Sequence, residues 1–367
     1  MEALGAIVER PGGPVRVEPI EVDAPGAGEV LVRVHASGVC HSDHWAIANG
    51  NWGAPFPMLL GHEGAGVVEA VGRDTDGPEA GTPVVLSWAV PCGSCRRCAR
   101  GQVRRCAHAW RQPPRVRLAR TGARLEGTLS LGTLATYTVV HAAQAIPVSA
   151  DLDPSLACLL GCGVSTGVGG ALQTGGVAAG DTVAVIGLGG IGLAAVQGAR
   201  IAGAERIVGI DLVARKLEWA AGLGATDTVD ASREDPVHAV RELTAGVGVD
   251  VAIEATGVPT CVAQAVAMCS GGGVAVAIGV PPLQSEVTLG WSGDDTSAYP
   301  NKVSLRVTDG GDPIPSEDFP RMAAWALDGR LDLGAMVTRR VELTEDALEE
   351  AFRSMLAGEV IRTVVRP

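Results

Sequence analysis

The segment TVAVIGLGGIG, residues 182–192, determines the expected fold of this chain. Its first five residues, Thr182–Ile186, form a continuous apolar run, as a buried parallel strand requires. Gly187, Gly189 and Gly192 follow with the spacing G-x-G-x-x-G, which is typical of a strand-to-helix turn where a pyrophosphate meets a helix N-terminus. The spacing alone is a weak signal, so the neighbouring sequence has to support it.

Strand-like and helix-like segments alternate after this turn. The strand-like runs are residues 206–211, 226–229, 249–254 and 274–279. This rhythm predicts βαβ units and therefore an α/β fold, with a doubly wound parallel sheet of Rossmann type over residues 161–300. Residues 1–160 consist mostly of short strand-like runs broken by Gly and Pro. They predict a β-rich catalytic domain, to which residues 301–367 return, so the Rossmann domain is inserted in it.

Composition excludes several classes of partner. The chain has 367 residues and a formal net charge of -12, which argues against nucleic acid and anionic membranes. Two uncharged segments, residues 154–180 and 257–285, are rich in Gly, Ser, Thr and Pro and indicate buried strand–turn–helix units rather than membrane spans. The first residues, MEALGAIVERPGG, show no secretory signal, so we expect a cytoplasmic protein with reduced cysteines.

Four of the nine cysteines form a compact motif, Cys92-x2-Cys95-x2-Cys98-x7-Cys106. Four thiolates at this spacing can close a tetrahedral zinc and leave no ligand position open for catalysis. The motif predicts a structural zinc in a lobe of about residues 91–107. An iron–sulfur cluster and a metal-free lobe are the alternatives.

A second possible metal site is spread along the chain. Cys40 in GVCHSD, His62 in GHEGAG and Cys162 in GCGVST offer two thiolates and one imidazole. Such a set holds a zinc with an open fourth position, where the metal can lower the pKa of an alcohol. Each of the three residues, taken singly, would more often be an ordinary interior side chain.

These motifs together resemble the zinc-containing medium-chain alcohol dehydrogenases over essentially the whole chain. The similarity is strongest to the mycothiol-dependent formaldehyde dehydrogenase branch, through the phrases LLGCGV, QTGGV, DTVAVIGLGG, RKLEWA, PSEDFP and MLAGEVIRTVV. The resemblance implies a GroES-like catalytic domain, two zinc ions per chain (one catalytic, one structural) and a homodimer or homotetramer.

The resemblance also implies roles around the catalytic zinc. Asp43 is expected to hold the ring of His62, and Glu63 to lie beside the metal. Ser42 matches the residue that takes the alcohol proton. Horse-liver-type enzymes continue the proton path with a histidine five residues after the first cysteine ligand, where this chain has Trp45. His44 or His41 could replace it, or protons could leave through water.

The expected cofactor is NAD. Asp211 ends the strand after the glycine-rich turn, where a carboxylate accepts from the adenosine ribose hydroxyls and repels a 2′-phosphate. Arg215 beside Lys216 is the feature that speaks for NADP. By resemblance, Lys216 lies at the ribose, and Arg362 reaches the pyrophosphate. The remaining predicted cofactor contacts are His41, Thr166, Gly187, Gly189, Gly190, Ile191, Gly192 and Val280.

The substrate is expected to be a small primary alcohol or its aldehyde. Trp88 matches an aromatic wall beside the zinc in relatives, and Trp52 could line the same site. The first alternative is the S-hydroxymethyl adduct of mycothiol and formaldehyde. It ranks second because residues 290–302, GWSGDDTSAYPNK, depart from the aromatic-rich stretch of that branch. A non-catalytic nucleotide-binding relative is the alternative from another class.

A run of arginines adds one open question about the substrate. Ten arginines lie between Arg96 and Arg124, with no acidic residue from Ala80 to Leu125. This cation density could attract an anionic substrate, or it could be a solvated lobe or a subunit contact.

Overall fold

The computed structural model describes residues 1–50, 55–100, 102–106, 113–294 and 296–367, and the chain forms two compact units. The first unit comprises Met1–Cys162, Ile314–Gly329 and Leu333–Pro367. The second comprises Gly163–Pro313 and Arg330–Asp332. The predicted return to the catalytic domain at residue 301 therefore differs from the observed division. The reason is that residues 304–307 form a strand of the second unit.

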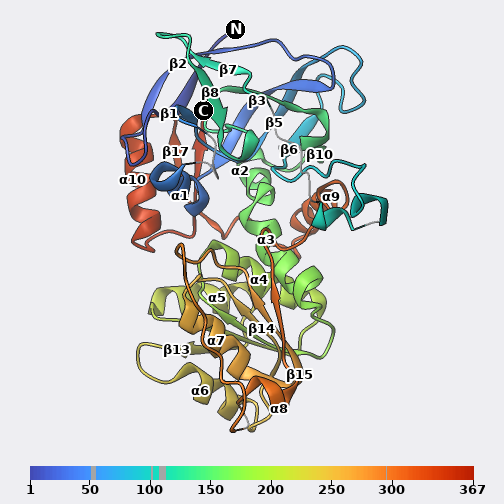
Figure 1. Ribbon diagram of the computed structural model, residues 1–367, viewed down its shortest axis with the longest axis vertical. Helices are drawn as coiled ribbons and strands as arrows, with labels where there is room; N and C mark the ends of the chain where they lie inside the picture. The colour runs from blue at the N-terminus through green and yellow to red at the C-terminus, as the bar shows by residue number, and fades with distance from the viewer. Residues whose placement is uncertain (51–54, 101, 107–112, 295) are drawn as a thin grey trace. The chain divides into compact units, whose positions relative to one another are not determined.

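The first unit contains a small closed barrel (Figure 1). Its strands, in barrel order, are β1 (Glu2–Val8), β2 (Arg16–Val22), β7 (Val116–Leu118), β8 (Arg124–Gly127) and β4 (Met58–Leu59). Alternate side chains of these strands point inward, and Ile7, Ile20, Leu59, Leu118 and Leu125 fill the interior. The expected β-rich domain is thus built from short strands around an aliphatic core.

A second sheet completes the first unit and includes the C-terminal strands. Its order is β10 (Ala145–Pro147), β6 (Pro83–Leu86), β5 (Glu63–Val71), β3 (Glu29–Gly38), β18 (Arg362–Arg366) and β17 (Val337–Glu342), with β9 (Tyr137–His141) also paired to β3. Val364 of β18 lies opposite Gly38 of β3 in an antiparallel ladder. This pairing brings residue 362 next to the segment that begins at residue 38.

Helices of the first unit cover this sheet. They are α1 (His41–Asn49), α2 (Pro154–Ala157), α9 (Pro315–Leu327) and α10 (Glu345–Leu356). Leu348 and Phe352 of α10 pack in one buried cluster with Ala6, Val39 and Val365. The C-terminal helix therefore supports the residue that precedes Cys40.

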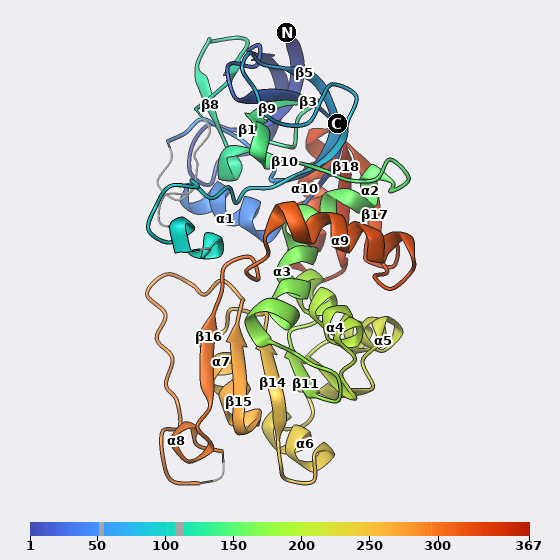
Figure 2. The same cartoon turned by 90° about the vertical axis from the view of Figure 1, so that its right-hand side faces the viewer.

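The second unit is built around a six-stranded parallel sheet (Figure 2). Its order is β13 (Asp227–Asp230), β12 (Arg206–Asp211), β11 (Thr182–Ile186), β14 (Val249–Glu254), β15 (Cys269–Ala277) and β16 (Ser304–Val307). The strand order reverses direction between β11 and β14, the kind of switch point where open α/β sheets bind ligands. This parallel sheet confirms the predicted α/β fold class.

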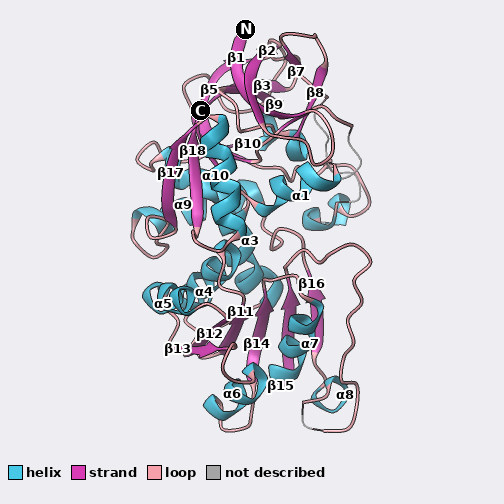
Figure 3. Cartoon of the chain, turned by 90° about the vertical axis from the view of Figure 1, so that its left-hand side faces the viewer, coloured by secondary structure: helices cyan, strands magenta, loops and turns pink. Residues whose placement is uncertain are grey.

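The helices of the second unit connect and cover its strands (Figure 3). They are α3 (Gly163–Gly169), α4 (Gly190–Ala202), α5 (Ala214–Leu223), α6 (Pro236–Leu243), α7 (Pro259–Met268) and α8 (Ala298–Asn301). Val183, Ala184 and Val185 are completely buried, as expected for a strand covered on both faces.

In the described part of the chain no single helix is long and apolar enough to cross a membrane. One bent pair, Pro154–Gly161 with Gly163–Gly175, could do so by length and composition alone.

Candidate metal centres and nucleotide-binding turn

Four donor side chains of the first unit converge in its interior. The ligand atoms of Cys40, His62, Glu63 and Cys162 all lie within 4.8 Å of one another, and all four residues are buried. Cys40 is the N-cap of α1, His62 and Glu63 lie where β5 begins, and Cys162 follows a short 3-10 turn, Cys158–Gly161. The structure thus joins three segments that are far apart in sequence.

Glycines make this convergence sterically feasible. Gly61 has φ +96°, and a Cβ atom there would lie 2.2 Å from the backbone nitrogen of Leu134. A Cβ at Gly38 would lie 2.1 Å from Oε2 of Glu63. Because these are impossible contacts for a larger residue, the glycines before Cys40 and His62 are required by the packing of the site.

Asp43 fixes the orientation of His62. Its Oδ1 lies 3.1 Å from Nδ1 of His62 and also accepts a hydrogen bond from the backbone N–H of Gly61 at 3.0 Å. Both side chains are fully buried. The opposite ring nitrogen, Nε2 of His62, is buried and has no hydrogen-bond partner among the described residues. An orphaned ring nitrogen beside two cysteine sulfurs fits a metal ligand whose other nitrogen is held by a carboxylate.

The electrostatics of the site favour a cation. A hydrogen bond from Cys162 holds the pKa of Cys40 well below its ordinary value, with further help from His62 and Arg362 and against the effect of burial. The same hydrogen bond, together with burial, raises the pKa of Cys162 well above its ordinary value. Burial disfavours the charged form of His62, but Asp43 and Cys40 outweigh it and raise the pKa of the imidazole. The lowered pKa favours the thiolate form of Cys40, which is the form that binds a metal.

Glu63 forms a buried ion pair that sequence reasoning did not predict. Its Oε2 accepts from Nη2 of Arg362, and both side chains are almost completely buried. Burial raises the pKa of Glu63 to about 7, although the Arg362 guanidinium opposes that shift. Nε of Arg362 has no partner among the described residues. The two residues are 299 positions apart, and no local pattern could have paired them.

The four-cysteine motif forms a second donor cluster. The sulfur atoms of Cys92, Cys95, Cys98 and Cys106 lie within 4.8 Å of one another, and the residues are half-buried. The N–H of Cys95 donates to Sγ of Cys92, and the N–H of Cys92 donates to Sγ of Cys106, both at 3.3 Å. Backbone N–H groups of Ser94 and Cys95 lower the pKa of Cys92. Such a cluster could hold a structural zinc.

The glycine-rich turn of the second unit has the stereochemistry that the sequence implied. Gly187 has φ +89°, and its Cβ would lie 2.4 Å from Thr256. A Cβ at Gly192 would lie 1.9 Å from the carbonyl oxygen of Gly187, whereas one at Gly189 would meet nothing within 4 Å. Gly189 is the N-cap of α4 and no side chain caps this end of the helix, so its first N–H groups are available to an anion.

Asp211 lies at this turn. Its Oδ2 accepts from the backbone N–H of Leu188 at 2.8 Å, and its Oδ1 accepts from that of Val213 at 3.0 Å. Nζ of Lys216 is 3.7 Å from Oδ2 of Asp211. The structure thus brings Asp211, Lys216 and the glycine-rich turn together, as expected for a ribose site.

Thr166, Ile191 and Val280 lie in the same unit. Thr166 is buried in α3, and its hydroxyl has no partner among the described residues. A Cβ at Gly167 would lie 2.2 Å from the carbonyl oxygen of Ile191, so α3 and the first turn of α4 touch closely. Val280 follows β15 and is 65% exposed. An orphaned hydroxyl and an exposed valine are consistent with a ligand surface.

The remaining predicted residues of the first unit occupy varied positions. Ser42 is partly buried in the first turn of α1, while His41 is exposed. The ring centroid of His44 lies 6.5 Å from that of Phe352. Trp88 is partly buried against the aliphatic core of the second sheet of this unit. Trp52 lies outside the described residues.

Glu254 is a buried acid that the sequence analysis missed. It ends β14, and its Oε1 accepts from the N–H groups of Thr256 and Gly257 at 2.5 and 2.8 Å, and from the Thr256 hydroxyl. Its Oε2 has no partner among the described residues. Because Thr256 packs on Gly187, Glu254 shapes the wall of the glycine-rich turn. The sequence did offer one signal for this residue, namely an acidic side chain at the end of the strand-like run VDVAIE.

The arginine run divides into two parts. Arg115, Arg117 and Arg120 form ion pairs with acids of the β1–β3 region, namely Glu29, Asp23, Glu9 and Glu18. Arg96, Arg100 and Arg105 are exposed near the four cysteines. Acids of the first unit therefore neutralise the arginines at the end of the barrel strands, whereas those near the four cysteines remain exposed.

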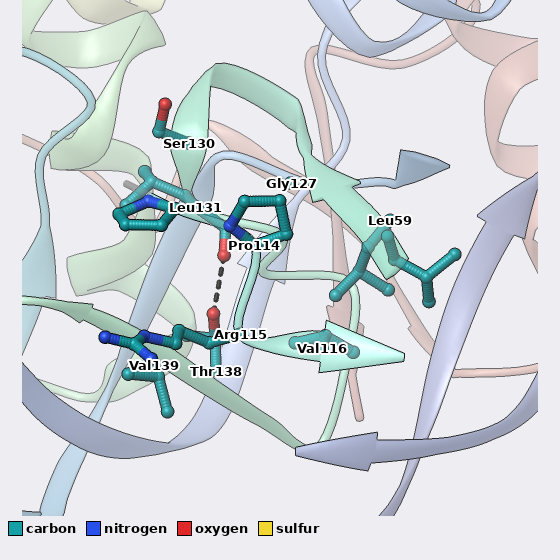
Figure 4. A pocket seen from close by; sticks show the side chains of 11 residues that line it. Leu59, Pro114, Arg115, Val116, Gly127, Ser130, Leu131, Thr138 and Val139 are labelled. Carbon is teal, nitrogen blue, oxygen red and sulfur yellow. Dashed lines mark hydrogen bonds between the residues drawn. The ribbon is translucent and has the colours of Figure 1, made fainter. Parts of the chain in front are cut away.

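A pocket beside the barrel does not involve the predicted site (Figure 4). Leu59, Val116, Leu131 and Val139 supply apolar walls, and Arg115 lies at one side. No predicted metal-binding or cofactor-binding residue is among those that line it.

Two family descriptions match the chain. "Alcohol dehydrogenase GroES-like domain" matches residues 26–150, and "zinc-binding dehydrogenase" matches residues 190–328. The chain is 35% identical over 379 residues to an S-(hydroxymethyl)glutathione dehydrogenase of Escherichia coli, with 100% of each chain covered.

Solved structures show the same similarity in three dimensions. An alcohol dehydrogenase zinc-binding domain protein from Burkholderia ambifaria is 32% identical, with a TM-score of 0.92 over 100% of this chain and 99% of that one. Benzyl alcohol dehydrogenase from Acinetobacter calcoaceticus is 26% identical, with a TM-score of 0.91 and the same coverage.

Proposed function

This chain belongs to the zinc-containing medium-chain alcohol dehydrogenase superfamily, and we propose that it interconverts a primary alcohol and its aldehyde with NAD as the hydride carrier. The observation that carries the proposal is the buried cluster of Cys40, His62 and Cys162, in which Nε2 of His62 finds no hydrogen-bond partner within the described part of the chain. Three donors of this kind fit a zinc with one position left for substrate.

The residues of the cluster have distinct tasks. Cys40, His62 and Cys162 would hold the ion, which supplies the Lewis acidity that makes an alcohol easier to deprotonate. Asp43 accepts from Nδ1–H of His62 and so keeps Nε2 as the nitrogen with the free lone pair. Ser42, two residues after Cys40, would take the alcohol proton and pass its own hydroxyl proton on, through His44, His41 or water. NAD would supply the nicotinamide that accepts hydride from the alcohol carbon.

Glu63 and Arg362 balance charge next to the cluster. Two thiolates would add negative charge to a buried site, and the Arg362 guanidinium offsets part of it. Nε of Arg362 has no hydrogen-bond partner among the described residues, so this side chain keeps one N–H group that can donate to an anion such as the pyrophosphate that the family resemblance assigns to it.

NAD is preferred to NADP because of Asp211. Its carboxylate lies at the glycine-rich turn, where it can accept from ribose hydroxyls and would repel a 2′-phosphate. The buried, unpartnered hydroxyl of Thr166 offers a hydrogen bond to the nicotinamide end.

A second candidate substrate is a thiol adduct of formaldehyde. The full-length similarity to S-(hydroxymethyl)glutathione dehydrogenase favours it. The adduct carries a primary hydroxymethyl group, so the same three metal ligands and Ser42 would act on it as on a simple primary alcohol. S-hydroxymethyl-mycothiol and S-hydroxymethyl-glutathione are the two forms to test.

The test combines metal analysis with a substrate panel. We expect two zinc ions per chain and NADH formation from simple and aryl primary alcohols without any added thiol. Strict dependence on mycothiol or glutathione would establish the thiol adduct instead. One zinc or none, with NADH binding but no turnover, would support the non-catalytic alternative.

We also infer that the protein is a homodimer or homotetramer. β16 is an edge strand of the parallel sheet, and Leu305 and Val307 on it are 40% and 78% exposed. Exposed apolar edge strands are templates for pairing with another chain. Light scattering coupled to size-exclusion chromatography measures the assembly, and a monomer at micromolar concentration would contradict it.

A further inference from the structure

The start of α5 places two cations beside the predicted ribose site. Arg215 and Lys216 follow Asp211 closely, and NADP differs from NAD by a phosphate on that ribose. Cations at this position would ordinarily favour NADP and weaken the discrimination that Asp211 provides. The contacts that these two side chains make in the folded chain decide whether they can bind that phosphate.

Lys216 is occupied by Asp211. Its Nζ lies 3.7 Å from Oδ2 of Asp211, and the two side chains are 20% and 8% exposed. The ion pair directs the ammonium group to the carboxylate, where it can also reach a ribose hydroxyl. It does not leave a free positive charge for a phosphate.

Arg215 is held by a different partner. Its Cζ lies 5.0 Å from the ring centroid of Trp219, one helical turn later. Residues four apart are neighbours on a helix, whereas consecutive residues are about 100° apart around it. The Arg215–Trp219 pair therefore lies on another face of α5 from Lys216. Arg215 is exposed and Trp219 partly buried, so the ring is a fixed platform for a mobile side chain.

We propose that Trp219 strengthens the discrimination against NADP that Asp211 provides, by holding the guanidinium of Arg215 on the flank of α5 and so keeping it from the 2′-phosphate. Trp219 is a positioning residue here, because it acts through Arg215 and does not touch the cofactor. This inference rests on the proposed function, since it assumes that the adenosine ribose lies at Asp211.

The proposal predicts a selective effect of one substitution. Trp219→Leu removes the aromatic face but keeps an apolar, helix-compatible side chain. Freed from an exposed cation–π contact, Arg215 should tighten NADPH binding by about two- to five-fold. The affinity for NADH should not change. Binding of each reduced cofactor to the zinc-loaded protein is measured by titration calorimetry.

Two further variants separate this role from a general structural one. In an Arg215→Gln background, Trp219→Leu should no longer alter NADPH affinity, because the cation that it releases is absent. Trp325→Leu is the matched control. Arg321 lies 5.3 Å from the Trp325 ring in the same four-residue spacing, on α9 of the first unit, and the loss of that pair should leave both cofactor affinities unchanged.

The outcomes are distinguishable. An equal change in NADH and NADPH affinity on Trp219→Leu, or a gain that persists with Arg215→Gln, overturns the proposal. Failure of the wild-type chain to bind NADH overturns the proposed function itself. Wild-type preference for NADPH over NADH overturns both the role of Asp211 and that of Trp219.

Discussion

At the scale of single residues, the chemistry depends on side chains that orient other side chains. Asp43 makes no predicted contact with substrate, yet it sets the ring position of His62 through one hydrogen bond at 3.1 Å. It also binds the backbone N–H of Gly61, which fixes the segment that carries His62. Loss of such a partner typically costs 10- to 100-fold in metal affinity.

The first prediction follows from that role. Asp43→Asn keeps the size of the side chain but removes the charge that holds Nδ1–H of His62. We expect zinc affinity at the catalytic site to fall by about 10- to 100-fold, while the four-cysteine zinc is retained. Zinc per chain is measured after dialysis against a graded chelator. Asp23→Asn, at a partly exposed ion pair with Arg117, is the control, and retention of both ions by Asp43→Asn would contradict the assignment.

The second prediction concerns the glycine-rich turn. A Cβ at Gly189 meets no protein atom within 4 Å, so Gly189→Ala should leave the melting temperature nearly unchanged. It should weaken NADH binding strongly, because the methyl group occupies space that the pyrophosphate needs. Calorimetric titration and thermal unfolding measure the two effects.

Gly222 of α5 provides the matched control for that substitution. A Cβ there also meets nothing within 4 Å, and Gly222→Ala should raise stability by about 0.5–1 kcal/mol through helix propensity. NADH affinity should stay at the wild-type level. Normal NADH binding by Gly189→Ala would exclude this turn as the pyrophosphate site.

At the scale of elements, some structure was readable from local sequence and some was not. The strand at 182–186 and the helix that starts at Gly190 follow from an apolar run and glycine spacing, both local signals. The edge strand Ser304–Val307 was missed as part of the parallel sheet, since its four residues are exposed and carry no buried-strand pattern. Its place is decided by hydrogen bonding to β15.

The third prediction tests the C-terminal helix α10. Leu348 is completely buried beside Val39 and Phe352, so Leu348→Ala should lower the free energy of unfolding by about 2–5 kcal/mol. Leu356, the last residue of the same helix, is 51% exposed. Leu356→Ala should therefore change the free energy of unfolding by less than about 1 kcal/mol. Urea denaturation of the zinc-loaded protein gives both values. Equal losses would mean that α10 does not support the core of the first unit.

At the scale of the whole molecule, each unit has a hydrophobic core of its own. Among the described residues, the buried cluster around Ile186 belongs to the parallel sheet of the second unit, whereas those around Leu348, Leu59 and Val84 belong to the first unit. The predicted metal ligands lie in the first unit and the nucleotide-binding turn in the second. Zinc held by those ligands and a nucleotide held at that turn would therefore stabilise different units of the chain.

The fourth prediction uses that separation. In calorimetry of chelator-treated protein, we expect two thermal unfolding transitions, one for each unit. NADH at 100-fold its Kd should stabilise the second unit by about 2.7 kcal/mol. Restoring zinc should shift the other transition. A single transition that both ligands raise together would show that the two units unfold cooperatively.

The sequence by itself determined the family, the α/β class, the glycine-rich turn after the first strand of the parallel sheet, and the compact four-cysteine motif. These features depend on short-range patterns, namely apolar runs, glycine spacing and cysteines within a few residues of one another. Tertiary structure alone brought Cys40, His62 and Cys162 within reach of one another and paired Glu63 with Arg362. Contacts such as that of Glu63 with Arg362 join residues hundreds of positions apart, and only the packing of strands and helices fixes which buried charges meet.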